Sequence, residues 1–205
     1  MKNAMILIGL ILFSGYVDAT PVTIDFESDW FGGKSNGFSS IGHPGVEFSD
    51  TIGSGLEVGF SDLVQCGFTN CLVVFGDDPS KLEMDFASAV GSLSLDFGND
   101  NPLYLGATDF AWLDIFNNGS LVDRVKVSPN RDEAMNQSIG YSGLPFDQAF
   151  FYYGDENGNP INLIETVDNV TYDAVSVPEP ATIMLFIVGL AGIGVARRGR
   201  LRFQI

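Results

Sequence analysis

Histidine and acidic residues are the side chains of this chain with the widest scope for catalytic chemistry. His43 is the only histidine, and it lies in the turn-like segment Gly42–Gly45. A Ser-His-Asp or Cys-His catalytic device would have to use it, and no serine stands in a Gly-x-Ser-x-Gly elbow. A glycosidase needs only two carboxylates, but no motif marks such a pair. The residues therefore favour a non-catalytic protein, with a secreted glycosidase as the less favoured alternative.

Asp168 is the carboxylate whose place in the sequence pattern is most informative. It stands in phase with Val170 and Tyr172, so a regular strand would point all three side chains at the core. A buried carboxylate is costly unless backbone amides, an arginine or a cation satisfy it. The alternative is a β-bulge that turns Asp168 out to solvent.

Cys66 and Cys71 are the two cysteines of the chain, and they flank the short segment Gly67–Asn70. In an oxidising compartment such a pair closes a small loop as a disulfide. A metal site would need further cysteine or histidine ligands, and His43 is the single histidine available. We therefore predict a disulfide between Cys66 and Cys71.

Trp30 is the best candidate for an exposed aromatic platform. It stands beside Asp29 and close to Gly32 and Gly33, in a segment with the composition of a loop. Sugar rings stack on exposed aromatic side chains, so Trp30 is the residue we expect to contact a sugar. The alternative is an ordinary loop aromatic without a ligand. Most other aromatic residues, Trp112 among them, are expected in the core.

The charge of the central part of the chain is strongly negative. Of the 26 Asp and Glu residues, 24 lie between residues 20 and 177, together with five of the 10 Lys and Arg residues, which gives a net charge of −19. Phosphate groups bind basic residues, so nucleic acid and anionic lipid are poor partners for this part, and we expect no nucleic-acid partner.

The central part reads as β-structure throughout, because short alternating runs are separated by Gly, Asn, Asp and Pro. Asn118-Gly119 is a strong hairpin signal. About ten strands at this spacing predict an all-β domain over residues 20–175, an antiparallel two-sheet sandwich. The expected strands are Val22–Glu27, Gly45–Ser49, Leu56–Phe60, Leu72–Phe75, Lys81–Phe86, Gly91–Phe97, Phe110–Phe116, Leu121–Val127, Ala149–Tyr153, Leu163–Thr166 and Asn169–Val175.

The first 19 residues have the pattern of a secretory signal peptide. Lys2 is followed by an apolar stretch over Met5–Phe13 and by a small-residue cleavage site at Val17–Ala19. The sequence therefore predicts export, which also suits the predicted disulfide.

The last 30 residues combine three features in a fixed order. Val177-Pro178-Glu179-Pro180 cannot continue a helix and presents an extended, accessible peptide. An apolar segment follows over Ala181–Ala196, long enough for a short transmembrane helix of about 24 Å. A basic cluster then keeps this end cytoplasmic: Arg197, Arg198, Arg200 and Arg202.

This order over residues 177–202 resembles the PEP-CTERM sorting signal of Gram-negative bacteria. The resemblance implies that an exosortase, an integral-membrane cysteine transpeptidase, recognises Val177–Pro180 and releases or re-anchors the protein. It also implies that the protein is anchored transiently in the inner membrane and then reaches the cell surface or the extracellular matrix. Such a matrix is the exopolysaccharide of a biofilm. The alternative is an ordinary single-pass anchor.

The order of strands is similar to that of jelly-roll domains in many PEP-CTERM proteins, which resemble carbohydrate-binding modules and lectins. This resemblance implies that the first and last strands lie side by side, which would bring Asp25 or Glu27 close to Asp168. Clustered carboxylates repel each other unless a cation lies between them, and calcium accepts such oxygens. We therefore expect a structural calcium site at these three residues.

These features predict an exported, exosortase-sorted surface or matrix protein whose β-sandwich binds exopolysaccharide without catalysis. A β-sandwich that binds only cations or a protein partner is the main alternative.

Overall fold

The computed structural model describes residues 20–53, 55–59, 63–76 and 78–174. The expected signal peptide, and the sorting motif, apolar helix and basic cluster at the other end, lie outside the described residues. Residues 19–175 form one compact unit. Its elements are β1 (Val22–Ile24), β2 (Gly32–Lys34), β3 (Val46–Asp50), β4 (Leu56–Gly59), the 3₁₀ turn η1 (Val64–Cys66), β5 (Cys71–Val74), β6 (Leu82–Gly98), β7 (Phe110–Asn117), β8 (Ser120–Val127), β9 (Gln137–Gly154) and β10 (Thr166–Ala174).

All strand pairs of this unit are antiparallel, and they form one hydrogen-bonded ladder in the order β2-β4-β5-β10-β6-β9-β7-β8. Two further strands lie off this path: β1 pairs with β10, and β3 pairs with β6. The all-β antiparallel fold predicted from the sequence is confirmed.

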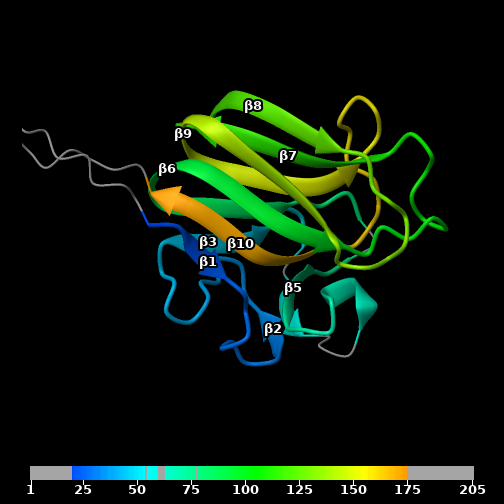
Figure 1. The fold of residues 1–205 in the computed structure, drawn as a ribbon, viewed down its shortest axis with the longest axis horizontal. Coiled ribbons are helices and arrows are strands. Elements are labelled where there is room, and N and C mark those ends of the chain that lie inside the picture. Colours follow the sequence, from blue (N-terminus) through cyan, green and yellow to red (C-terminus); the bar gives the residue numbers. More distant parts are fainter. Residues whose placement is uncertain (1–19, 54, 60–62, 77, 175–205) are drawn as a thin grey trace, which may run out of the picture. The chain divides into compact units, whose positions relative to one another are not determined.

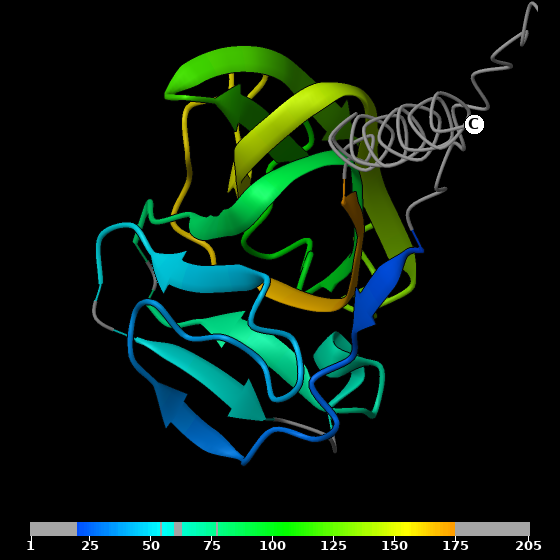
Figure 2. The same ribbon diagram turned by 90° about the vertical axis from the view of Figure 1, so that its left-hand side faces the viewer.

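Two layers arise because β6 and β9 are long and bend. The first part of β6 pairs with β3, and its second part pairs with β10. The β6–β9 register shifts between Asp85 and Val90 and again before Ser92, as expected where bulges bend a strand. In consequence, β7 and β8 lie in one layer and β1, β2, β5 and β10 in the other (Figure 1). Viewed at 90°, β10 runs beside β6 (Figure 2).

The hydrophobic core lies between these layers. The ring centroids of Phe97 on β6 and Phe151 on β9 are 5.6 Å apart, and those of Phe86 and Tyr172 are 5.3 Å apart. All four side chains are buried, and each fully buried large side chain contributes about 1.5–3 kcal/mol. A second, small cluster joins Cys66, Cys71 and Val73 under the loop that precedes β5.

The hairpin predicted at Asn118-Gly119 is confirmed. These two residues join β7 to β8, with Asn117 opposite Ser120. Both have positive φ angles, 48° for Asn118 and 73° for Gly119, as a type I′ turn requires.

Candidate functional site

The pairing of the first and last strands brings three predicted site residues to one place. In the β1–β10 pair, Val22 lies opposite Tyr172 and Ile24 lies opposite Val170. Asp25 and Glu27, which follow β1, therefore come close to Asp168 on β10. Together with Asp96 on β6, they line a hollow of about 330 Å³, here called the carboxylate hollow. The remaining residues that line it are Cys66, Gly67, Thr69, Met135 and Asn169.

Asp168 is buried, with only 3% of its surface exposed. Its Oδ1 accepts a hydrogen bond from the Asn169 backbone N–H at 2.7 Å, and its Oδ2 accepts one from the Thr69 hydroxyl at 3.1 Å. A bulge does interrupt β10, but it follows Asp168: Asn169 has a φ of 49°, and the register shifts before Thr171. The bulge directs Asn169 Nδ2 to Asp96 Oδ2 at 3.0 Å and leaves Asp168 inside.

The electrostatic environment of Asp168 opposes its ionisation. Burial raises the pKa of its carboxyl to about 7, although hydrogen bonds from Asn169 and Thr69 lower it. The neighbouring charges of Glu27 and Asp25 raise this pKa further. A cation in the carboxylate hollow would relieve this repulsion.

The carboxylates of the hollow do not already surround a metal-sized space. Within residues 20–53, 55–59, 63–76 and 78–174, no three His, Cys, Asp or Glu side chains lie close enough together to hold an ion. Glu27 Oε1 accepts the Asn70 backbone N–H at 2.8 Å, and Asp25 Oδ1 accepts the Glu27 N–H at 3.2 Å. The oxygen types suit calcium, but these side chains would have to close around the ion. Calcium binding here stays a prediction.

The predicted disulfide between Cys66 and Cys71 is formed. Gly67, with a φ of 64°, ends the 3₁₀ turn η1, and the Thr69 hydroxyl donates to the Cys66 carbonyl at 2.8 Å. These contacts place the Thr69 hydroxyl between the Cys66 carbonyl and Asp168 Oδ2, which share its single proton. The loop closed by the disulfide therefore forms one wall of the carboxylate hollow.

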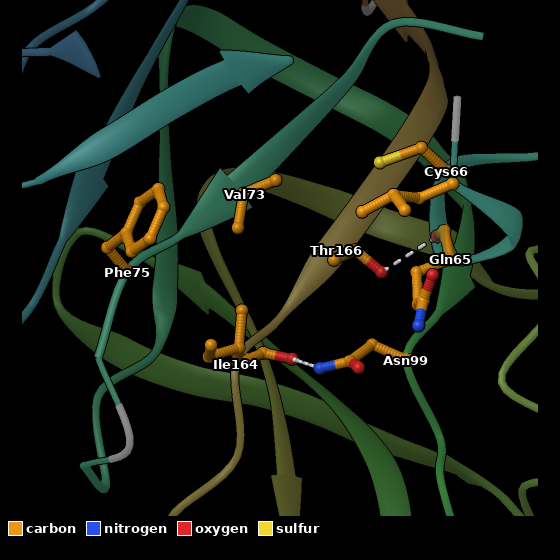
Figure 3. A pocket seen from close by; sticks show the side chains of 8 residues that line it. Gln65, Cys66, Val73, Phe75, Asn99, Ile164 and Thr166 are labelled. Atoms are coloured by element: carbon orange, nitrogen blue, oxygen red, sulfur yellow. Dashed lines mark hydrogen bonds between the residues drawn. The ribbon is translucent and has the colours of Figure 1, made fainter. Parts of the chain in front are cut away.

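A smaller and mainly apolar pocket of about 150 Å³ lies between the η1 segment, β5 and the start of β10 (Figure 3). Its polar groups largely bond to the pocket's own backbone. The Thr166 hydroxyl donates to the Gln65 carbonyl at 3.1 Å, and Asn99 Nδ2 donates to the Ile164 carbonyl at 2.8 Å. The pocket therefore offers few polar groups that could orient a sugar.

Trp30 lies in the loop between β1 and β2 with 81% of its surface exposed. The loop is fixed from below by the buried Asp29, whose Oδ2 accepts the Ser40 hydroxyl at 2.6 Å and whose Oδ1 accepts the Ile41 N–H at 2.9 Å. Lys34 Nζ donates to the Trp30 carbonyl, which fixes the backbone of the loop further. The indole ring is thus presented to solvent from an anchored loop.

Trp112 is buried as expected, but on the outer side of its layer, away from the main core cluster. Its Nε1 donates to the Asp155 carbonyl at 3.0 Å, and Lys126 Nζ lies 4.9 Å from its ring centroid. Beside it, Asp114 accepts two hydrogen bonds from Arg124, at 2.6 and 2.9 Å, and Lys81 lies 3.7 Å away. Three of the five basic residues of the domain therefore gather on this face.

Glu165 is a buried acidic residue that the sequence analysis did not single out. It is 0% exposed and no side chain of the described residues hydrogen-bonds its carboxyl; the backbone N–H groups of Glu165 and Tyr153 act on it as donors that lower its pKa. Burial raises the pKa of its carboxyl well above the usual value, and the charges of Asp50 and Asp78 raise it further. The sequence did hold a signal, because Glu165 alternates in phase with the buried Leu163 and Val167.

Comparisons with solved structures find matches at low identity. The K2 cleaved adhesin domain of Lys-gingipain is 14% identical, with a TM-score of 0.46, over 75% of this chain and 99% of that one. A family 29 carbohydrate-binding module is 16% identical, with a TM-score of 0.40, over 80% of this chain and 97% of that one. A DUF4465 family protein from Bacteroides caccae is 10% identical, with a TM-score of 0.44, over 76% and 99%.

The sequence comparisons bear on the end of the chain that follows the β domain. A comparison with curated proteins finds no match. Among the described residues, no helix has the length and apolar character needed to span a membrane. Residues 176–200 match the PEP-CTERM protein-sorting motif, which confirms the assignment made from Val177–Pro180. The chain therefore carries an all-β domain followed by a PEP-CTERM protein-sorting motif.

Proposed function

We propose that this protein is exported, processed by an exosortase and retained at the cell surface or in the extracellular matrix, where its β domain binds exopolysaccharide without catalysis. The observation that carries the proposal is the sorting motif at residues 176–200. The disulfide between Cys66 and Cys71 agrees with export, since such bonds persist in oxidising compartments. The strongly acidic surface keeps such a protein soluble outside the cell.

The sugar-binding part of the proposal is supported by Trp30. A sugar ring stacks its C–H face on an aromatic ring, and this requires a ring that is both exposed and held in place. Trp30 meets both conditions, because its ring is 81% exposed and Asp29 anchors its loop. Phe31 beside it is 68% exposed and packs against Gly59, so the aromatic surface extends beyond one ring.

The carboxylate hollow is the one place that gives the glycosidase alternative a physical basis. Asp168 has a pKa of about 7 and lies beside Glu27, as a general acid beside a second carboxylate would. However, both of its oxygens already accept hydrogen bonds, and it is only 3% exposed. It is therefore poorly placed to protonate a glycosidic oxygen. We expect no release of reducing sugar when the protein is incubated with the polymer.

Sedimentation with the host's own exopolysaccharide tests the binding proposal. We expect wild-type protein to sediment with the polymer and Trp30→Ala to bind about tenfold more weakly, a loss of about 1.4 kcal/mol. Tyr104→Ala is the matched control, since Tyr104 is also exposed, at 69%, but lies in a different loop. Equal binding by wild type and Trp30→Ala would remove Trp30 from the proposal. No binding by wild type would favour a partner other than a polysaccharide.

A further inference from the structure

The outer surface of one layer is a continuous sheet face with opposite charges at its two ends. Its strands follow the order β3-β6-β9-β7-β8. Residues that pair across neighbouring strands point to the same side of a sheet, so the register shows which side chains share this face, here called the outer face. Three rows of paired residues cross it: Glu47–Asp85–Gln148–Phe116–Leu121, Ser49–Glu83–Phe150–Asp114–Arg124 and Tyr152–Trp112–Lys126.

The acidic end of the outer face lies on β3 and β6 and consists of Glu47, Glu83 and Asp85. Gln148 on β9 holds two of these acids together, because its Nε2 donates to Glu83 Oε1 at 2.8 Å and to Asp85 Oδ1 at 2.9 Å. Burial and the charge of Asp85 raise the pKa of Glu83, although the hydrogen bond from Gln148 lowers it. Within the part of the chain that the structure describes, the ion pairs are those of Asp114, so no cation of that part balances the acidic end.

The basic end of the outer face lies on β8, at the opposite edge, and consists of Arg124 and Lys126. Arg124 is held by Asp114 on β7, to which its Nε and Nη2 donate at 2.6 and 2.9 Å. Lys126 is exposed, and its Nζ lies 4.2 Å from the ring centroid of Phe110 and 4.9 Å from that of Trp112. No carboxylate among the described residues pairs with Lys126. Its charge is therefore available to a group from outside the chain.

The middle of the outer face is apolar and only partly covered. Phe116 on β7 and Phe150 on β9 pack edge to face with ring centroids 5.4 Å apart, and both are half-buried. Leu121, which pairs with Phe116, is 53% exposed. Five strands and three rows of residues give a surface of about 24 Å by 20 Å, or roughly 500 Å². Two such surfaces would bury roughly 1,000 Å² together, the lower limit for a specific interface, so they suit a weak dimer.

We propose that the outer face binds the outer face of a second copy of this chain, in a two-fold dimer that sets the acidic end of each copy on the basic end of the other. A two-fold interface brings the same surface of both copies together, so that surface must be complementary to itself. The outer face meets this condition, because its ends carry opposite charges and its middle is apolar.

The strongly negative charge of the domain does not prevent such a dimer. Residues 20–177 carry a net charge of −19, which opposes the approach of two copies. Salt screens distant charges more strongly than pairs in contact, so matched charges at the interface can offset this repulsion. The dimer depends neither on sugar binding nor on sorting.

Zero-length crosslinking of the full chain in detergent tests the contact directly. A carbodiimide joins a lysine amine to a carboxylate only where the two groups touch. Within one copy, Lys126 and Asp85 are three strands apart, about 14 Å, too far for such a bond. In an equal mixture of isotope-labelled and unlabelled protein, we expect mixed-label peptides that join Lys126 to Glu47, Glu83 or Asp85. The absence of such peptides from wild type would overturn the proposal.

Charge reversal separates this contact from association elsewhere in the chain. Lys126→Glu and Asp85→Lys change exposed side chains, and each places like charges opposite one another twice in the dimer. Each variant alone should therefore dimerise about tenfold more weakly than wild type in sedimentation velocity. An equal mixture of the two variants should form mixed dimers about as readily as wild type, because the two reversed charges then face each other.

Glu57→Lys is the matched control for Asp85→Lys. It makes the same change of charge on β4, which lies between β2 and β5 in the other layer, so it should dimerise like wild type. Recovery in the mixture also shows that both variants are folded. Single variants that dimerise as well as wild type, or a mixture that fails to recover, would contradict the proposed dimer.

Discussion

At the scale of single residues, the two buried carboxylates show what alternation in a sequence can reveal. The phase of Asp168 with Val170 and Tyr172 left two possibilities open, an inward side chain or a bulge that turns it to solvent, and the side chain lies inside. Glu165 carries the same signal, in phase with Leu163 and Val167, but the expected strand Leu163–Thr166 was too short to make it stand out. The hydrogen bond from Thr69 to Asp168 joins residues 99 positions apart, so no local pattern could predict it.

The raised pKa of Asp168 predicts a specific dependence of stability on pH. Its pKa is about 7 in the folded state, against 3.8 for a free side chain, so folding favours the protonated form. The stabilisation is therefore complete below about pH 4 and is lost as the pH rises through 7. In EGTA, we expect the free energy of unfolding of wild type to fall by about 2–4 kcal/mol over this range relative to Asp168→Asn.

Urea unfolding of both proteins between pH 4 and 8 measures this difference. A constant difference across the range would show that Asp168 is ionised throughout in the folded state. Calcium gives a second readout, because an ion bound by Asp25, Glu27 and Asp168 would hold Asp168 ionised and flatten the wild-type curve. A curve that calcium does not change would contradict a calcium site in the carboxylate hollow.

We expect replacement of the Asp114 side chain to lower the free energy of unfolding strongly. Its side chain is 2% exposed and bonds to Arg124, Lys81 and the Tyr152 hydroxyl. Asp114→Ala leaves Arg124 and Lys81 without their carboxylate, while the Tyr152 hydroxyl keeps the Gly158 carbonyl as an acceptor at 3.1 Å. We therefore expect a loss of about 2–3 kcal/mol, reduced from the fully buried case because Arg124 is partly exposed. Asp123→Ala, at an exposed position on β8, should cost less than about 0.5 kcal/mol in the same urea titration. Similar losses for both variants would contradict this role.

At the scale of elements, the sequence predicted where strands lie better than where they end. The hairpin of β7 and β8 was predicted correctly, because Asn-Gly sets a tight turn and the flanking residues alternate. β6 was expected as two strands, Lys81–Phe86 and Gly91–Phe97, but it is continuous over Leu82–Gly98. The small residues at its bend look like a turn in sequence, yet bulges carry the strand through it.

The first half of β9 and the short strand β2 were not predicted at all. β9 begins at Gln137, and its first residues are rich in Ser and Gly, which have low strand propensity. They form a strand because they pair with the second half of β6, from Ser92 to Phe97. This pairing is a tertiary effect. β2 lies in the Gly/Ser-rich segment that was read as a loop.

The disulfide between Cys66 and Cys71 holds the loop that forms one wall of the carboxylate hollow, so removing the bond should change the properties of Asp168. Cys66 and Cys71 are five positions apart, and closing so short a loop contributes about 2 kcal/mol in the chain-entropy account. We expect the double variant Cys66→Ser, Cys71→Ser to lose about that much stability and to weaken the contact of Thr69 with Asp168. The pH dependence assigned to Asp168 should change with it. Stability equal to that of wild type under oxidising conditions would contradict a structural role for the bond.

At the scale of the whole molecule, one part of the chain indicates where the protein is sent and another part indicates what it binds. The sorting motif is a local pattern of a few residues, so the sequence alone was enough to identify it. A sugar site depends on side chains that come together only in the folded domain. The sequence was enough to suggest Trp30 as a sugar-contacting residue. Its 81% exposure and the buried Asp29 beneath it could be seen only in the structure.

The central claim is that the chain is exported and cut at its sorting motif, and intact-mass measurement of the protein recovered from the host's surface tests it most directly. We expect a mass that lacks both the first 19 residues and the segment after Val177–Pro180, including Arg197 and Arg198. Replacing the motif's acid, Glu179→Ala, should leave this tail attached and hold the protein in the membrane fraction. A wild-type surface protein that keeps its arginine-rich end, or a full-length chain in the cytoplasm, would contradict the account.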